Sequence, residues 1–425
     1  MRQHRKEETM QKADAKRIEQ WIDGMNRFNT TPEYGTTRVL FTKMELANRS
    51  YVKQEMEKLG LNVTEDAIGN IYASFEGSSP ELPPVWTGSH IDTVPNAGKF
   101  DGMAGVVCGL EAVRLMKESG IQPKRTIQVI VYTSEEPTRY GLSCLGSRAM
   151  SGDLTLEDTT ALQDQGGLSL HDKLQSLGYD LSQFTKIEKK RGDVFAAVEL
   201  HIEQSSRLER LGLPIGLVKK ICAPSNYIVE VTGCQSHAGG TDMKERRDAY
   251  TAACEMSLAL ETLAKNCPSE YNTATIGSVQ NVPGAMNVIP GKCIFTVDIR
   301  DCTMDTKQAL IQQMKKEFNQ IAQKRGVDVT IQEENNDLPL TCNEQILDIL
   351  RGCCDEQNLP YTELISGPYH DSLFVGRFAP TAMIFVPSKN GISHSPDEWT
   401  DYEQLARGAD VLASALFKLA EKESL

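Results

Sequence analysis

Hydrophobic residues in the first part of the chain recur with the spacing of helices and then of strands. Residues 18–28 and 46–59 carry them at helical spacing, which predicts two amphipathic helices. Short apolar runs predict strands at 70–75, 85–87 and 126–132. A helical pattern at 103–119 lies between the second and the third of these strands. Strands alternating with helices indicate an α/β domain with a mostly parallel central sheet.

The order of elements changes after residue 227. Six segments follow as strand, helix, strand, strand, helix and strand, at 227–232, 249–265, 273–279, 293–300, 306–325 and 327–333. This βαββαβ order is the ferredoxin-like arrangement. A chain of 425 residues also exceeds the size of a single hydrophobic core. We therefore expect one domain from residues 1–215 and 337–425, with a second domain inserted at 216–336.

The composition excludes several classes of function. Hydrophobic residues make up 40% of the chain and charged residues 24%, as in an ordinary soluble protein. The net charge of −13 argues against nucleic acid as a partner, because phosphates require clustered Lys and Arg. An acidic exterior still permits a small anionic substrate, held by one or two local arginines.

The expected cellular location depends on whether the sequence contains membrane-spanning or signal segments. We find no apolar run of about 18 residues or more and no apolar signal segment at the amino terminus, so we expect no membrane partner. The 11 cysteines are too sparse for a disulfide framework and are typical of reduced thiols. These features favour a cytoplasmic protein.

Residues with metal-ligand chemistry follow the predicted strands. Two cations about 3.5–4 Å apart repel each other, so a carboxylate that bridges them is required, and neutral imidazoles can fill outer positions. Asp101 suits the bridge. We expect His90 and His201 to hold one cation with Asp101, and Glu136 and His394 to hold the other. This mixed set of ligands suits Mn²⁺, Zn²⁺ or Co²⁺.

Two further acids lie beside these ligands. Asp92, two residues after His90, is expected to accept the second imidazole N–H and to fix the tautomer. Glu135 precedes the ligand Glu136 and is left without a metal. An uncoordinated carboxylate beside an activated water is what a general base requires. Both residues are therefore candidate catalytic residues. We expect the ions and their ligands to lie at the carboxyl ends of the strands, where open α/β sheets bind ligands.

From about residue 21 to 416 the chain resembles the M20-type dinuclear amidohydrolases and peptidases. Glu-Leu-His201-Ile-Glu-Gln resembles the branch that acts on carbamoyl and ureido compounds, whereas peptidase relatives tend to place an acid at this histidine. The stretches at 134–148 and 366–372 are most similar to the ureidoglycolate amidohydrolase subfamily. The resemblance implies a dinuclear hydrolase, with manganese favoured, and an inserted domain that acts as a lid and dimerises. It also leaves endoplasmic reticulum location open, since plant members are associated with that compartment.

Other residues are candidates for substrate contact. The loop Gly233-Cys-Gln-Ser-His237 resembles the lid loop whose histidine reaches the partner subunit's active site in a homodimer, where a donor would stabilise an oxyanion. Arg300 and Asn287 can bind a carboxylate, although Arg300 can equally pair with Asp298 or Asp301. Three more candidates for substrate binding are Gln204, Tyr369 and His370.

These features predict a metal-dependent amidohydrolase that cleaves the ureido C–N bond of ureidoglycolate to glyoxylate, ammonia and carbon dioxide, in purine catabolism. The alternatives within the same branch are hydrolysis of allantoate or of an N-carbamoyl-L-amino acid. A peptidase is less favoured because of His201. From another class, the chain could be a non-catalytic binding protein that kept its metal site, although such a protein has no use for Glu135 as a base.

Overall fold

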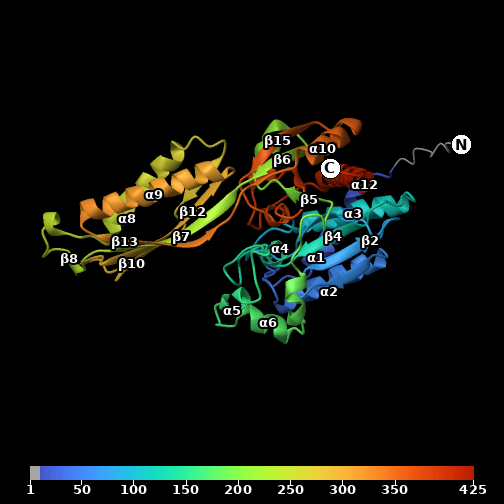
Figure 1. Cartoon of the computed structure of the whole chain (residues 1–425). Helices are drawn as coiled ribbons and strands as arrows, with labels where there is room; N and C mark the ends of the chain where they lie inside the picture. Colours follow the sequence, from blue (N-terminus) through green and yellow to red (C-terminus); the bar gives the residue numbers. More distant parts are fainter. Residues whose placement is uncertain (1–9) are drawn as a thin grey trace. The chain divides into compact units, whose positions relative to one another are not determined.

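The computed structural model describes residues 10–425, and these form two compact units. Figure 1 shows the helices and strands of the two units. Among the described residues, the first contains residues 10–219, Cys342–Leu364 and His370–Leu425, and the second contains Lys220–Thr341 and Ile365–Tyr369. The second unit therefore ends five residues beyond the predicted boundary at 336, and it also takes in the short return segment before His370.

A nine-stranded sheet runs through the first unit in the order β1-β2-β4-β3-β5-β16-β6-β14, with β15 also paired to β6. Its strands are β1 Asn62–Glu65, β2 Ile71–Phe75, β3 Val85–His90, β4 Ile127–Tyr132, β5 Ala196–Ile202, β6 Ile215–Ile221, β14 Leu340–Thr341, β15 Tyr361–Ser366 and β16 Thr381–Val386. The pairs β3–β4, β3–β5 and β5–β16 are parallel. β3, β5 and β16 are buried along their whole length, as expected of strands in a sheet that is covered on both faces.

Long helices cover this sheet. The helices α3 Met103–Glu118 and α12 Tyr402–Glu421 pack against each other and against β3 and β5. Gly105 permits this close packing, because a Cβ there would lie 2.4 Å from the Leu200 carbonyl oxygen. The other long helices are α1 Ala15–Asn26, α2 Lys43–Lys58 and α10 Glu344–Glu356. The predicted α/β fold with a largely parallel sheet is confirmed.

The segment between β4 and β5 forms short helices. They are α4 Leu145–Ser151, α5 Asp158–Ala161, α6 Leu170–Ser176 and the 3₁₀ helix Leu181–Lys186. Leu170, Leu174 and Phe184 from this segment are buried in one hydrophobic cluster with Trp86 of β3 and Leu145 of α4. This packing fixes the start of α4 close to the carboxyl end of β4. Two other short helices of the unit are α7 Arg207–Leu211 and α11 Ser372–Val375.

The second unit is a five-stranded sheet with two long helices. The sheet runs β10-β12-β7-β13, with β9 also paired to β12. Its elements in chain order are β7 Ala223–Thr232, α8 Ala249–Lys265, β9 Asn272–Thr275, β10 Val279–Val282, β12 Lys292–Asp301, α9 Met304–Arg325 and β13 Asp328–Asn336. Both helices bury their apolar faces against the sheet, in a core that includes Met256, Phe295 and Phe318. A small pair, β8 Ser236–His237 with β11 Val288–Ile289, completes the unit.

One predicted strand of this unit is two strands in the structure. The sequence predicted a single strand over 273–279, but the pairing with β12 is interrupted between β9 and β10. At the interruption the Ser278 backbone N–H donates to the Thr296 hydroxyl oxygen at 3.1 Å instead of to a ladder carbonyl. The preceding Gly277 has no side chain to pack on the sheet, which favours a break at this point. Across residues 10–425, the structure contains no helix with the length and apolar character needed to span a membrane.

Candidate metal centre

The predicted ligands stand at the ends of neighbouring strands. His90 is the last residue of β3, and His201 lies one residue before the end of β5, the parallel neighbour of β3. Asp101 lies just before α3, and Glu136 follows β4. His394 follows β16 in a backbone conformation with φ +54°. Because parallel strands end at the same edge of a sheet, residues from five separate segments reach one place.

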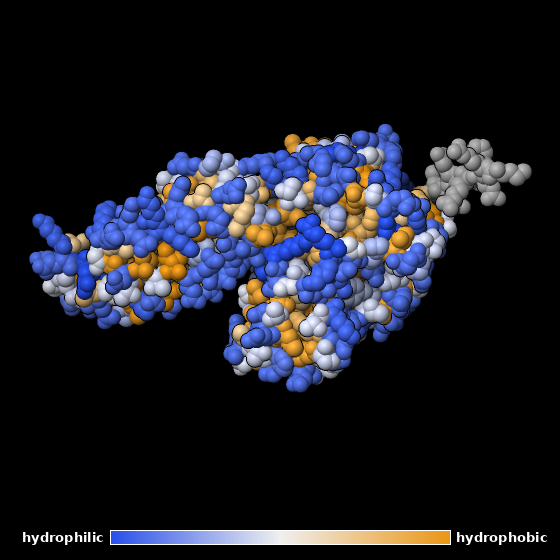
Figure 2. All heavy atoms as spheres, viewed as in Figure 1, coloured by the Kyte–Doolittle hydropathy of each residue, from blue (hydrophilic) through white to orange (hydrophobic). Residues whose placement is uncertain are grey.

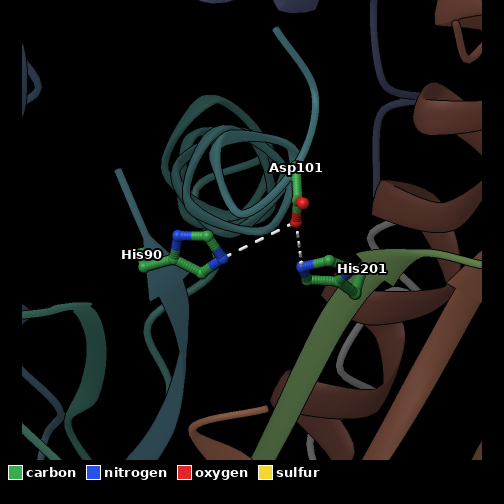
Figure 3. A group of neighbouring side chains, drawn as sticks. All are labelled: His90, Asp101 and His201. Carbon is green, nitrogen blue, oxygen red and sulfur yellow. Dashed lines mark ion pairs between the residues drawn. The ribbon is translucent and has the colours of Figure 1, made fainter. Parts of the chain in front are cut away.

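Asp101 lies at the centre of this group. Its Oδ1 atom is 3.2 Å from His201 Nε2 and 3.7 Å from His90 Nε2 (Figure 3). Its Oδ2 atom is 3.0 Å from His394 Nε2, and His394 Nε2 is also 3.5 Å from Glu136 Oε1. Two groups with ligand spacing therefore share one carboxylate: His90, Asp101 and His201 form the first, and Asp101, Glu136 and His394 form the second.

The electrostatics of the group call for added positive charge. Burial raises the pKa of Glu136 to about 7, with the Asp101 charge as a further cause. Burial also raises the pKa of Glu135 well above its usual value. For Asp101 burial acts in the same direction, yet the neighbouring imidazoles of His201, His394 and His90 hold its pKa well below the usual range. Within residues 10–425, His90 Nε2 is among the buried side-chain atoms with no hydrogen-bond partner. A divalent cation fits such a set of crowded acids and an unpartnered imidazole nitrogen.

Asp92 departs from its expected contact. The His90 Nδ1–H donates to the backbone carbonyl of Asp92 at 3.0 Å, whereas the Asp92 carboxylate is 3.7 Å away. That carboxylate instead accepts the backbone N–H groups of Glu135 and Glu136, at 3.3 and 3.2 Å. The strand turns directly after His90, so the carbonyl rather than the side chain lies beside the ring. The tautomer of His90 is still fixed, with Nε2 presented to Asp101.

Glu135 lies beside the two groups. Its Oε2 is 3.8 Å from His90 Nε2, and its Oε1 is 4.0 Å from the buried Cys144 thiol. The ligand groups found among residues 10–425 do not include it. Its backbone is fixed by α4, because the Cys144 N–H donates to the Glu135 carbonyl at 3.0 Å.

Glu398 supports the centre and was missed from the sequence. Its Oε1 accepts the backbone N–H groups of Phe100 and Asp101, at 2.9 and 3.1 Å. Its Oε2 accepts the Ser393 hydroxyl at 2.8 Å. The candidate substrate residue Gln204 contacts the same place, since its amide donates to Asp101 Oδ2 at 3.1 Å. Glu398 follows His394 by four residues in an irregular segment, so no periodic signal marked it.

His370 also lies in the first unit, close to the first ligand group. Its ring centroid is 4.5 Å from that of His201, and both side chains are buried. Glu199 lies beside them: ligand atoms of Glu199, His201 and His370 all lie within 4.8 Å of one another. Glu199 was also missed from the sequence, where it reads as one more residue of a buried strand.

The remaining candidates lie in the second unit. His237 and Asn287 are close together, because β8 and β11 pair and the Ala238 N–H donates to the Asn287 carbonyl at 2.9 Å. The Gly239 N–H donates to His237 Nδ1 at 3.1 Å, so Nε2 carries the hydrogen and His237 is an outward donor.

Arg300 and Tyr369 form a separate pair in that unit. The Arg300 guanidinium lies 5.5 Å from the Tyr369 ring centroid. It also pairs with Asp298 through Nε at 2.9 Å and Nη2 at 3.1 Å. The sequence allowed two partners for Arg300, a substrate carboxylate or a neighbouring acid such as Asp298. The structure contains the pair with Asp298. The fork that holds Arg300 in place uses Nε and Nη2.

An α/β domain with two carboxylate and imidazole groups sharing an aspartate, in a chain with a second, ferredoxin-like unit, is typical of metal-dependent hydrolases. The model of Peptidase family M20/M25/M40 matches residues 86–418, and the chain belongs to this family. It is 40% identical to a protein named ureidoglycolate hydrolase from Oryza sativa subsp. japonica over 414 residues, 96% of this chain and 85% of that protein.

Two further similarities cover nearly the whole chain. An N-carbamoyl-L-amino-acid amidohydrolase from Pseudomonas sp. (strain NS671) is 33% identical over 93% of this chain and 96% of its own length. A crystal structure described as AtUAH in complex with (S)-hydroxyglycine matches with a TM-score of 0.87 and 39% identity, covering 97% of this chain and 98% of that chain. The family resemblance inferred from the motifs is therefore confirmed.

Proposed function

We propose that this chain is a metal-dependent amidohydrolase that cleaves the ureido C–N bond of ureidoglycolate, giving glyoxylate, ammonia and carbon dioxide in purine catabolism. The observation that carries the proposal is the pair of ligand groups sharing Asp101, with the free carboxylate of Glu135 beside them. The choice of substrate is supported by the 40% identity to a ureidoglycolate hydrolase over almost the whole chain.

Five residues would hold two divalent cations. His90 and His201 would hold one and Glu136 and His394 the other, with Asp101 between them. We propose manganese, with zinc and cobalt as alternatives, because a mixed set of imidazoles and carboxylates accepts all three. When bound, such ions lower the pKa of water and stabilise negative charge on a carbonyl oxygen.

Glu135 acts as the general base in this proposal. Its carboxylate takes a proton from the attacking water as the water oxygen bonds to the ureido carbonyl carbon. The same carboxyl group then returns the proton to the leaving nitrogen, so the C–N bond breaks with the electron pair on nitrogen. Asp92 holds the backbone of Glu135 during both transfers. The released amine carries a hydroxyl group on the adjacent carbon and loses ammonia to give glyoxylate, while the carbamate gives ammonia and carbon dioxide.

The candidate substrate-binding residues form two sets, one in each unit. Arg300 is held by Asp298 and lies beside Tyr369, which suits recognition of the substrate carboxylate by a guanidinium, with Asn287 as a further donor. His370, and Gln204 beside Asp101, would contact the ureido group. His237 would donate its Nε2–H to the oxyanion.

We further propose a homodimer in which His237 acts in the partner subunit's active site. The second unit carries exposed apolar side chains where a second copy could pack: Val279 on edge strand β10 is 51% exposed and Leu258 on α8 is 65% exposed. Figure 2 shows hydrophobic surface among hydrophilic residues over this unit. An edge strand with apolar side chains favours pairing with another chain.

Mixing two inactive variants tests the dimer. Glu135→Gln and His237→Ala proteins are inactive alone on this proposal, but a hybrid dimer contains one site with both native residues if His237 acts across the interface. We expect mixed, refolded subunits to recover activity. No recovery, despite hybrid dimers found by mass spectrometry, would contradict the proposal that His237 acts in trans.

Ammonia release is the test of the reaction. Ureidoglycolate, allantoate and several N-carbamoyl-L-amino acids are compared with manganese and with zinc, and glyoxylate or free amino acid is identified as product. We expect ureidoglycolate to give the highest kcat/KM. A higher value for an N-carbamoyl-L-amino acid, the substrate class named for the Pseudomonas relative, or for allantoate would move the assignment within the branch.

The same assay addresses the non-catalytic alternative. Glu135→Gln keeps the shape of the side chain and removes its basicity, so we expect turnover to fall about 10²-fold or more while bound metal is unchanged. Unchanged turnover in Glu135→Gln would reject the role of Glu135 as general base. An absence of turnover by wild type on every ureido compound, with metal bound, would instead favour a binding protein. A cytoplasmic location also stays a prediction.

A further inference from the structure

We propose that Glu199 is a positioning residue that fixes His370 against the ligand His201. The catalytic consequence rests on the proposed function, in which His370 contacts the ureido group. The placement itself follows from hydrogen bonds inside the first unit. Glu199 and His201 are two residues apart on β5, so their side chains lie on the same face of the sheet.

Glu199 is a buried carboxylate with three donors. The Ser89 hydroxyl on β3 donates to Oε1 at 2.9 Å. Oε2 accepts both the hydroxyl and the backbone N–H of Ser372, at 2.6 and 3.2 Å. A carboxylate buried this deeply is costly unless it is hydrogen-bonded, and here the bonds join β3 and β5 to the first residue of α11.

This anchor controls the turn that carries His370. His370 stands two residues before Ser372, and the turn closes through a bond of 2.9 Å from the Leu373 N–H to the His370 carbonyl. With Ser372 held on Glu199, the His370 ring lies 4.5 Å from the His201 ring. Ligand atoms of Glu199, His201 and His370 are all within 4.8 Å. One acid therefore sets the distance between a metal ligand and a substrate contact.

A second bond holds the opposite side of the turn. The Ser147 hydroxyl on α4 donates to Asp371 Oδ1 at 2.6 Å. The turn at 370–372 is thus tied both to β5 and to the helix whose start fixes Glu135. Removing the Glu199 tie leaves the Ser147 tie in place, so the turn should shift rather than unfold.

Substitutions at both ends of the bond to Ser372 test the inference. Glu199→Ala and Ser372→Ala each remove a bond that holds the turn, whereas Ser89→Ala removes a bond to the same carboxylate on the side away from the turn. A displacement near 1 Å can cost about 10²-fold in rate. We expect kcat/KM for ureidoglycolate to fall about 10²-fold in Glu199→Ala and about tenfold in Ser372→Ala, with bound metal unchanged, and Ser89→Ala to stay within about threefold of wild type.

The variant Glu199→Gln distinguishes the effect of the hydrogen bonds of Glu199 from the effect of its charge. Its amide can accept from Ser372 and donate to Ser89, so we expect activity within about tenfold of wild type. The inference is overturned if Glu199→Ala keeps wild-type kcat/KM, or if Gln is as impaired as Ala.

Crystal structures of the metal-loaded variants give a readout that is independent of turnover. We expect the His370 ring to be displaced in Ser372→Ala and to keep its place in Ser89→Ala. An unmoved ring in Ser372→Ala would overturn the inference even if the protein hydrolysed no ureido compound. If wild type hydrolyses no ureido compound but the His370 ring is displaced in Ser372→Ala, only the proposed function is contradicted.

Discussion

The Asp92 carboxylate accepts the backbone N–H of Glu136 at 3.2 Å and thereby joins the end of β3 to the segment after β4. The same carboxylate accepts the Glu135 N–H at 3.3 Å, while the Asp92 carbonyl orients His90. One buried acid therefore positions two candidate metal ligands, His90 and Glu136, and the proposed base. Its contribution lies in geometry rather than in contact with substrate.

Loss of one oxygen acceptor at Asp92 should disturb both glutamates. In Asp92→Asn the amide nitrogen cannot accept a backbone N–H, so one of these two bonds is lost. We expect metal affinity to weaken about 10- to 100-fold, as for other residues that orient metal ligands. Isothermal titration with Mn²⁺ measures it. Equal affinities in Asp92→Asn and wild type would contradict the assigned role.

Asp298 should influence substrate binding through Arg300. Its carboxylate holds the guanidinium at two points, and the pair is partly exposed, so the effect should be moderate. Asp298→Asn removes the carboxylate that accepts hydrogen bonds from both Nε and Nη2 of Arg300. We expect KM for ureidoglycolate to rise about tenfold, corresponding to ~1.4 kcal/mol, with kcat nearly unchanged.

Asn226→Ala is the matched control for Asp298. The Asn226 amide donates to Asp298 Oδ2 at 3.1 Å, so this variant removes a contact of the same carboxylate and keeps its pair with Arg300. Steady-state kinetics of both variants should show a rise in KM for Asp298→Asn alone. If Arg300→Ala raises KM but Asp298→Asn and Asn226→Ala do not, Arg300 binds substrate without support from Asp298.

Asp371 should make the stability of the fold depend on pH. Burial, with the Glu199 charge as a further cause, raises the pKa of Asp371 to about 8. The unfolded chain ionises this group near pH ~4, so between about pH 4 and 8 the folded state holds a proton that the unfolded state has lost. This group therefore makes the free energy of unfolding fall as pH rises through that window.

Asp371→Asn removes the ionisable group and keeps an oxygen for the Ser147 hydroxyl. The free energy of unfolding of the variant, relative to wild type, should therefore increase between pH 5 and pH 8. Urea unfolding in the presence of a chelator measures it without the pH dependence of metal binding. Parallel curves for the two proteins across this range would reject the raised pKa.

The sequence was sufficient where a residue's place follows from its own strand or helix. Apolar runs located β3 and β4, so His90 at the end of β3 and Glu136 shortly after β4 could be placed at one edge of the sheet. Helical spacing located α8 and α9 for the same reason. These predictions depend on local periodicity and on the geometry of parallel sheets.

The sequence was insufficient where a bond depends on the exact approach of distant segments. Glu398 reaches the backbone of Asp101 from near the other end of the chain, and Glu199 meets Ser372 across two elements. For Asp92, the spacing from His90 predicted a contact between the carboxylate and the ring, but in the structure the Asp92 carbonyl makes this contact. The gap between β9 and β10 likewise depends on Thr296 in another strand.

Metal stoichiometry gives the most direct test of the central claim, that two cations are held around Asp101. Protein stripped with a chelator is titrated with Mn²⁺ and analysed for bound metal, for wild type and for Asp101→Asn, which removes the charge of the shared carboxylate. The account predicts two tightly bound ions per chain in wild type, from the two ligand groups, and loss of at least one in the variant. Wild type that binds no divalent ion tightly, or a variant that binds both ions as tightly as wild type, would contradict it.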